Sequence, residues 1–200
     1  MSDTTTAGYP VTFEFDPPEK IARWRPLVHW LLAIPHFIIL YVLGILAEIL
    51  ALVAWFCGVF TGKIPEGIQT PIAMYVRYNA RVMSYALFLR EEYPPFAFTS
   101  SFADPGEDPR VRVDFAPELE GRNRVTIFFR LFLLIPQAIV LAIVAIGLYF
   151  VMIIGFFAVL ITGAWPEGLR KFVVGVVRWD IRLSGYAYLL TDKYPPFSLQ

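Results

Sequence analysis

The second half of this chain repeats the first half, motif by motif and in the same order. Each motif lies 101 residues before its copy, as Pro35 and Pro136 show (136 − 35 = 101), so the copies align without a gap over most of their length. The other paired motifs are Thr61-Gly62 and Thr162-Gly163, Pro65-Glu66-Gly67 and Pro166-Glu167-Gly168, and Tyr93-Pro94-Pro95-Phe96 and Tyr194-Pro195-Pro196-Phe197. A chain built in this way is expected to fold into two related modules.

The composition is that of a membrane protein. Hydrophobic residues make up 57% of the chain and charged residues only 17%, where soluble proteins average about 25% charged residues. A mean hydropathy of +0.58 agrees with this class. Because the formal net charge is +0 and the Lys and Arg residues are dispersed, nucleic acid is not expected as a partner. Membrane lipids are the expected surroundings.

The repeat divides the chain into a first module at residues 9–96, a polar linker at 97–109 and a second module at 110–197. Each module carries a long apolar run with a proline near its start, Pro35 or Pro136. Such a run exceeds what a bilayer core of about 30 Å requires at about 1.5 Å per residue. Proline removes a backbone donor and breaks the run.

Each proline thus leaves one spanning helix after it, at residues 36–60 and 137–161. Residues 19–30 mix basic and aromatic side chains, which predicts an amphipathic helix in the membrane interface before the first span. The next stretches, 68–89 and 169–190, are long enough to cross a bilayer but contain arginines. The predicted fold is therefore an all-α integral membrane protein of two tandem helical hairpins with four crossings, and two crossings are the alternative.

Charge counting gives an orientation. In the hairpin arrangement most Lys and Arg residues lie on the side of the termini, which predicts cytoplasmic termini in a multi-pass protein of the cell membrane. The same arrangement puts the two repeats in parallel rather than inverted orientation.

A short stretch before each apolar run alternates apolar and polar residues, as a strand with one covered face does. These stretches are residues 11–16 and 111–115, and the sequence predicts that they pair. Glu14 and Arg112 would then be cross-strand neighbours of opposite sign. The residues expected to share the apolar face are Val11, Phe13, Phe15, Val111, Val113 and Phe115. Because two strands alone are marginal in water, they should rest on the helices or on a partner protein.

Four arginines are candidate functional residues. Arg77 and Arg81 fall on one stripe of their helix, and Arg178 and Arg182 occupy the matching places in the second module. An arginine at mid-bilayer costs at least about 2.5 kcal/mol on insertion scales. These side chains are therefore expected either to reach lipid phosphates or backbone carbonyls as structural groups, or to line a solute or ion path.

Two acids complete the candidate polar set. Glu48 lies in the middle of the first apolar run, where a carboxylate is costly unless it is protonated or paired, and Arg77 or Arg81 is a possible partner. Asp180 lies between the two arginines of the second module, where the first module has Asn79. Such groups either relay protons or lock a pair of helices, and the sequence leaves both interpretations open.

The Tyr-Pro-Pro-Phe motifs end the predicted helices. Proline disfavours helical geometry in the residue before it, and the chain continues as a stiff extended segment. One interpretation is a helix terminator whose aromatic rings anchor at the interface. The other is a docking surface for a partner, formed by Tyr93, Pro94, Pro95, Phe96, Tyr194, Pro195, Pro196 and Phe197.

No catalytic, cofactor or metal motif stands out. His29 and His36 have no Cys or carboxylate at ligand spacing, so interfacial packing explains them better than a metal site does. There is no Gly-rich phosphate loop and no nucleophile elbow. We therefore expect neither enzyme activity nor a cofactor.

The combined motifs resemble a known family. An Arg-Trp pair with an Ile-Pro break, a Thr-Gly-x-x-Pro-Glu-Gly turn, an Arg-x-x-x-Arg helix and a closing Tyr-Pro-Pro-Phe occur in a bacterial membrane family, common in actinobacteria and catalogued as domain of unknown function 4389. The resemblance covers both copies, from about Tyr9 to the C-terminus. It implies membrane location but no activity.

The function expected from the sequence is that of a non-catalytic accessory or scaffold subunit of a membrane complex, with a membrane-protein partner or a second copy of itself. The alternative is a small transporter or channel-like protein that uses Glu48 and the arginine stripes. That alternative requires these residues to line one shared wet cavity.

Overall fold

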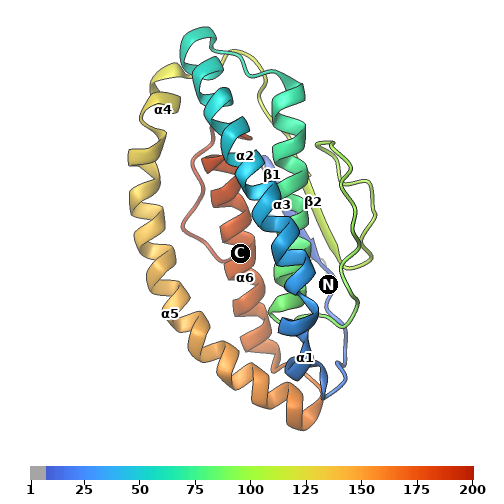
Figure 1. The fold of residues 1–200 in the computed structure, drawn as a ribbon. Coiled ribbons are helices and arrows are strands. Elements are labelled where there is room, and N and C mark those ends of the chain that lie inside the picture. The colour runs from blue at the N-terminus through green and yellow to red at the C-terminus, as the bar shows by residue number, and fades with distance from the viewer. Residues whose placement is uncertain (1–7) are drawn as a thin grey trace.

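A computed structural model describes residues 8–200, and Figure 1 shows its eight helices and strands. The first copy contributes β1 (Val11–Phe15), α1 (Arg25–Leu32), α2 (Ile34–Thr61) and α3 (Glu66–Ala86), and the second contributes β2 (Val111–Phe115), α4 (Arg124–Phe128), α5 (Arg130–Thr162) and α6 (Glu167–Ala187). The two copies thus have the same order of elements, as their sequences predict.

The elements form three layers. The long helices α2 and α5 are outermost, and each packs on the following helix of its own copy, α3 or α6 (Figure 1). Helices α3 and α6 pack on each other and form the middle layer. The two-stranded sheet covers their other side, with β2 against α3 and β1 against α6. Each strand therefore packs on the middle helix of the other copy.

The predicted strand pairing is confirmed. Strands β1 and β2 are antiparallel, and Glu14 lies opposite Arg112. Val11 pairs with Phe115, and Phe13 with Val113. These four apolar residues join the core cluster between the sheet and the middle helices. The pair is stable here because it rests on α3 and α6, as expected for so small a sheet.

The two copies are related by an approximate two-fold axis, and each binds the end of the other's middle helix. Gln69 Nε2, at the start of α3, donates to the Leu189 carbonyl beyond α6 at 2.7 Å. Trp165 Nε1, just before α6, donates to the Phe88 carbonyl beyond α3 at 2.8 Å. Phe88 and Leu189 are equivalent positions, and both have positive φ, at 46° and 64°. The middle helices are therefore antiparallel, and the modules interlock.

The helix break differs between the copies. In the first copy, a turn at Ala33 separates α1 from α2, just before Pro35. In the second copy, Pro136 lies inside the continuous helix α5, and the break comes earlier, at Phe129. The expectation that Pro136 breaks its helix is therefore wrong. A proline can stay within a helix where the carbonyl groups it frees find other donors.

The outer faces of α2 and α5 are apolar and exposed. Two stretches, Arg25–Thr61 and Arg130–Thr162, are long and apolar enough to cross a membrane by length and composition. Little of their most apolar part is covered by the rest of the chain, so neither resembles the buried core helix of a soluble protein. The exposed side chains include Ile38, Tyr41, Ile49, Leu52, Ile139, Ile143, Ile146 and Ile153. The predicted four crossings are not confirmed, because α3 and α6 lie between two other layers.

One contact, present in both copies, shows how the volumes of two facing side chains are matched within each copy. In α5, a Cβ added at Gly155 would lie 2.1 Å from the Trp165 ring. The equivalent residues of the first copy are Ala54 and Ile64, which pack in one cluster. A small residue faces a large one in the second copy, and intermediate residues face each other in the first.

We predict that Gly155→Ala destabilises the fold by about 1–3 kcal/mol through overpacking, and that the same substitution costs much less in a Trp165→Ile background, where the ring that meets the added methyl group is absent. A thermal or denaturant melt of the purified chain measures both effects. Ala54→Gly serves as a control, because it opens space at the equivalent position. Additive losses in the double variant would contradict the prediction, since contacting residues should couple.

Candidate functional site

The arginines of α3 converge on one buried carboxylate in the linker. Arg81 Nη2 lies 3.2 Å from Asp104 Oδ1, and Arg77 Nε lies 3.4 Å from Asp104 Oδ2. Arg81 Nη1 also reaches Glu107 at 3.1 Å. The side chains of Arg81 and Asp104 have no exposed surface. Ion pairs hidden from water in this way must be well satisfied by hydrogen bonds to be tolerated.

Asp104 also holds the sheet and its own loop. Its carboxylate accepts the backbone N–H of Gly106 and the backbone N–H of Val113, each at 2.9 Å. Its own N–H donates to Asp114 at 2.6 Å. Asp104 could not be selected from the sequence, because a single acid in a polar linker resembles any solvated residue. Only the fold reveals it as a structural centre.

Arg77 fastens the linker to α3 through backbone oxygens. Its guanidinium donates to the carbonyls of Val113 at 3.1 Å, Ser101 at 3.0 Å and Phe102 at 3.0 Å. A guanidinium has five N–H donors, which suits it to collect several carbonyls at once. Of the two interpretations of the arginine stripe, this geometry supports the structural one for Arg77.

In the second copy, the two arginines of α6 contact segments near the two ends of the chain. Arg178 Nη1 donates to the Leu199 carbonyl at 3.5 Å. The Arg182 guanidinium lies 5.9 Å from the centre of the Tyr9 ring, while the Tyr9 hydroxyl donates to the Arg182 carbonyl at 3.4 Å. Burial raises the pKa of Tyr9, so it remains a neutral donor. These contacts again hold segments in place.

Glu48 and Asp180 do not join the arginines. Glu48 is exposed on α2. The hypothesis that it pairs with Arg77 or Arg81 is wrong, because both arginines bind Asp104 on the sheet side of α3. Asp180 is half-buried on α6, and burial raises the pKa of its carboxyl group. The six candidate polar residues therefore occupy several separate places.

The tyrosines of the Tyr-Pro-Pro-Phe motifs bind their own helices. Tyr93 donates its hydroxyl to the Leu32 carbonyl, and Tyr194 donates to the Leu133 carbonyl, both at 3.2 Å. Each carbonyl comes three residues before the proline of its apolar run. The hydroxyl thus satisfies backbone where the proline disturbs the helix.

The phenylalanines of these motifs pack on the middle of the fold. The Phe96 ring stacks on His36 with its centre 4.4 Å away, and Phe197 meets Trp179 edge-on at 6.0 Å. Both rings keep about half of their surface exposed, at 50% and 53%. The motifs are therefore internal anchors, and their second proposed role as a docking surface stays a prediction.

Equivalent polar contacts use different residues in the two copies. His36 Nδ1 and the Tyr78 hydroxyl are 2.5 Å apart, and at the matching positions Trp179 Nε1 donates to Gln137 Oε1 at 2.9 Å. His29 lies on the Tyr85 ring, and Arg130 lies on the equivalent Tyr186 ring. The histidines thus pack on aromatic rings, as predicted, and each also takes part in a hydrogen bond. Within residues 8–200, no group of three His, Cys, Asp or Glu residues could hold a metal ion.

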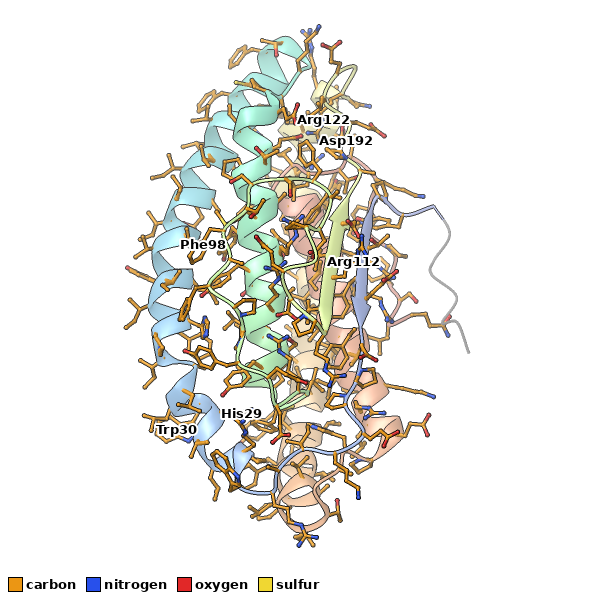
Figure 2. The ribbon with its side chains drawn as sticks, turned by 90° about the vertical axis from the view of Figure 1, so that its right-hand side faces the viewer. His29, Trp30, Phe98, Arg112, Arg122 and Asp192 are labelled. Carbon is orange, nitrogen blue, oxygen red and sulfur yellow. The ribbon has the colours of Figure 1, made fainter. Side chains whose placement is uncertain are left out.

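A second buried ionic centre is formed by Asp192 and two arginines. Asp192 accepts from Arg122 at 3.0 Å and from Arg130 at 2.5 Å. Figure 2 shows Arg122 and Asp192 close together towards one end of the fold. Burial tends to raise the pKa of Asp192, but the two guanidinium groups outweigh it and hold that pKa below its usual value. Arg122 and Asp192 were not predicted, since neither belongs to a repeated motif.

Comparison with family models places both repeats in one family. The model described as domain of unknown function (DUF4389) matches residues 23–97 and again residues 124–198. The chain belongs to this family. No curated protein and no solved structure matches it. The strands lie outside both matched ranges, although the DUF4389 repeats contribute the arginines and helices that hold them.

The Asp104 centre of this DUF4389 protein yields a prediction. Asp104→Asn removes the negative charge that Arg77 and Arg81 share and leaves Arg81 only Glu107 as an ionic partner, so we expect a loss of about 3 kcal/mol in the free energy of unfolding. Asp16→Asn is the matched control, because Asp16 pairs with Arg110 at an exposed position and should cost no more than about 1 kcal/mol. Denaturant titration of both variants measures the difference. Equal losses would refute a special role for Asp104.

Proposed function

We propose that this DUF4389 protein is a non-catalytic membrane scaffold with one face on lipid and one face on partner proteins. The single observation behind the proposal is the two-sided structure, with exposed apolar helices on one side and a polar sheet on the other. Soluble monomers rarely expose apolar patches larger than a few hundred Å², and larger patches mark contact with lipid or protein.

The lipid side consists of the outer faces of α2 and α5. Tyr41 is 72% exposed and Phe60 is 70% exposed on α2, while Ile146 is 62% exposed on α5. Large apolar side chains follow one another along both helices with few charges among them. Lipid is the medium in which such faces carry no cost.

The opposite side suits water or a polar partner. Glu14 is exposed on the outer surface of the sheet, and the Arg112 side chain is 58% exposed. Arg110 links Asp16 at 2.7 Å and Glu92 at 2.7 Å across the same side. Charged groups at this density favour aqueous contact.

The position of the sheet supports a molecule that lies along the membrane surface. The strands run beside the middle of α3 rather than beyond its ends (Figure 2). If α2 and α5 crossed the bilayer, the sheet would lie at mid-membrane depth, where open strand edges cannot be satisfied. In the surface orientation, the approximate two-fold axis is normal to the membrane. Both copies then present the same face to the membrane.

The transporter alternative has less support. It requires Glu48 and the arginine pairs in one cavity, whereas Arg77 and Arg81 are bound to Asp104 on the other side of α3. The described polar side chains mostly connect one segment of the chain to another. That use of polar groups is what a rigid platform requires.

Cysteine labelling tests the orientation. Cys57, the single cysteine of the chain, is first replaced by Ser. Single cysteines are then introduced in turn by Glu19→Cys and Lys63→Cys, at positions towards opposite ends of the α1–α2 unit. Surface orientation predicts that an impermeant maleimide labels both from the same side of sealed vesicles. Labelling from opposite sides would show that α2 crosses the bilayer and would overturn the proposed orientation.

Partner binding tests the scaffold role. We expect chemical cross-linking in native membranes, followed by quantitative mass spectrometry, to recover a defined partner with the intact chain. Glu14→Lys, on the polar sheet, should reduce that recovery at least about tenfold. Glu66→Lys is the control, an equal charge change at an exposed position away from the sheet. A chain that is recovered alone, or a partner unaffected by Glu14→Lys, would contradict the proposal.

A further inference from the structure

The lipid-facing side contains two grooves at equivalent positions of the two copies. The first has a volume of about 380 Å³, and on α2 it is lined by Glu48, Ala51, Leu52 and Trp55. The second has a volume of about 290 Å³, and on α5 it is lined by Tyr149, Met152, Ile153 and Phe156. These two sets correspond one to one at the repeat offset. The duplication has therefore produced the same groove twice.

The two grooves differ in charge and in space. Each lining residue of the second groove is apolar or aromatic. In the first groove, Glu48 replaces Tyr149 and Ala51 replaces Met152, so a carboxylate and additional room appear together. A volume of 380 Å³ falls within the range of about 300–1,000 Å³ found for small-molecule sites.

Glu48 is the charged group of the first groove that a ligand can reach. Arg130 also lines the groove, but its side chain is buried and donates to the Tyr186 and Thr191 carbonyls and to Asp192. Among residues 8–200, Glu48 takes part in none of the ion pairs observed. A carboxylate on a lipid-facing surface is costly without a cation beside it.

We propose that the first groove binds one amphiphile of the surrounding membrane, with its protonated amine on Glu48 and its chain along Ala51, Leu52 and Trp55. Residues 48, 51, 52 and 55 form one stripe of α2, which offers a continuous apolar track for a chain. The amine supplies the missing positive charge, and Trp55 is held in place because its Nε1 donates to the Ile127 carbonyl at 3.0 Å. The proposal takes from the proposed function only the lipid origin of the ligand.

Binding of three probes with the same chain tests the site. The intact protein in neutral detergent is titrated with tetradecylamine, tetradecanol or tetradecanoic acid, and native mass spectrometry counts the bound molecules. We expect one tetradecylamine per chain, bound at least about tenfold more tightly than the alcohol or the acid. Preference for the acid, or no preference, would overturn the proposal.

Two variants test separately the charge of Glu48 and the room left by Ala51 in the first groove. Glu48→Gln should bring the three probes to within about threefold of one another, and Ala51→Met, which copies the second groove, should weaken amine binding at least about tenfold. Tyr149→Phe in the second groove is the control and should bind as the parent does. Unchanged amine preference in Glu48→Gln, or unchanged amine affinity in Ala51→Met, would refute the site. Because the measurement is made in detergent, its outcome is independent of membrane orientation and of partner binding.

Discussion

Burial of guanidinium groups between helix and strand is the constraint on which this fold depends. Arg77 and Arg81 lie within the protein, and Asp104 together with a set of backbone carbonyls makes that burial tolerable. Because those carbonyls belong to the linker and to β2, the arginines decide where these segments lie. The sheet and the linker are thus bound to α3, whose other side packs on the apolar outer helix α2. These bonds add to the apolar packing that holds the two-stranded sheet against α3.

The sequence predicted those features that depend on periodicity and on repetition. The alternation in residues 11–15 and 111–115 was sufficient for the pairing of Glu14 with Arg112. The partner of Arg77 could not be predicted, because a carbonyl oxygen has no sequence signature and Asp104 lies in an irregular linker. The number of crossings was equally inaccessible. Hydropathy measures how apolar a helix is, but not whether a sheet or lipid covers it, and α3 is covered on both sides.

Duplication has left the two copies similar in framework and different in detail. His36 with Tyr78 has become Gln137 with Trp179, and Ala54 with Ile64 has become Gly155 with Trp165. In each case both members of a contact changed together, which preserves packing. The grooves on the outer faces of α2 and α5 did not follow this rule, since Glu48 forms no ion pair within the described chain. Differences that preserve a contact concern stability, and a difference that leaves a charge unmatched indicates a role of its own.

The exchange of helix-end contacts between the copies has a consequence for assembly. The Phe88 carbonyl accepts a hydrogen bond from Trp165, and the Leu189 carbonyl accepts one from Gln69. A polypeptide containing only one repeat would leave such an oxygen exposed, together with half of a sheet. Such a polypeptide could satisfy the carbonyl and pair its strand by forming a dimer with a second identical molecule across the same axis.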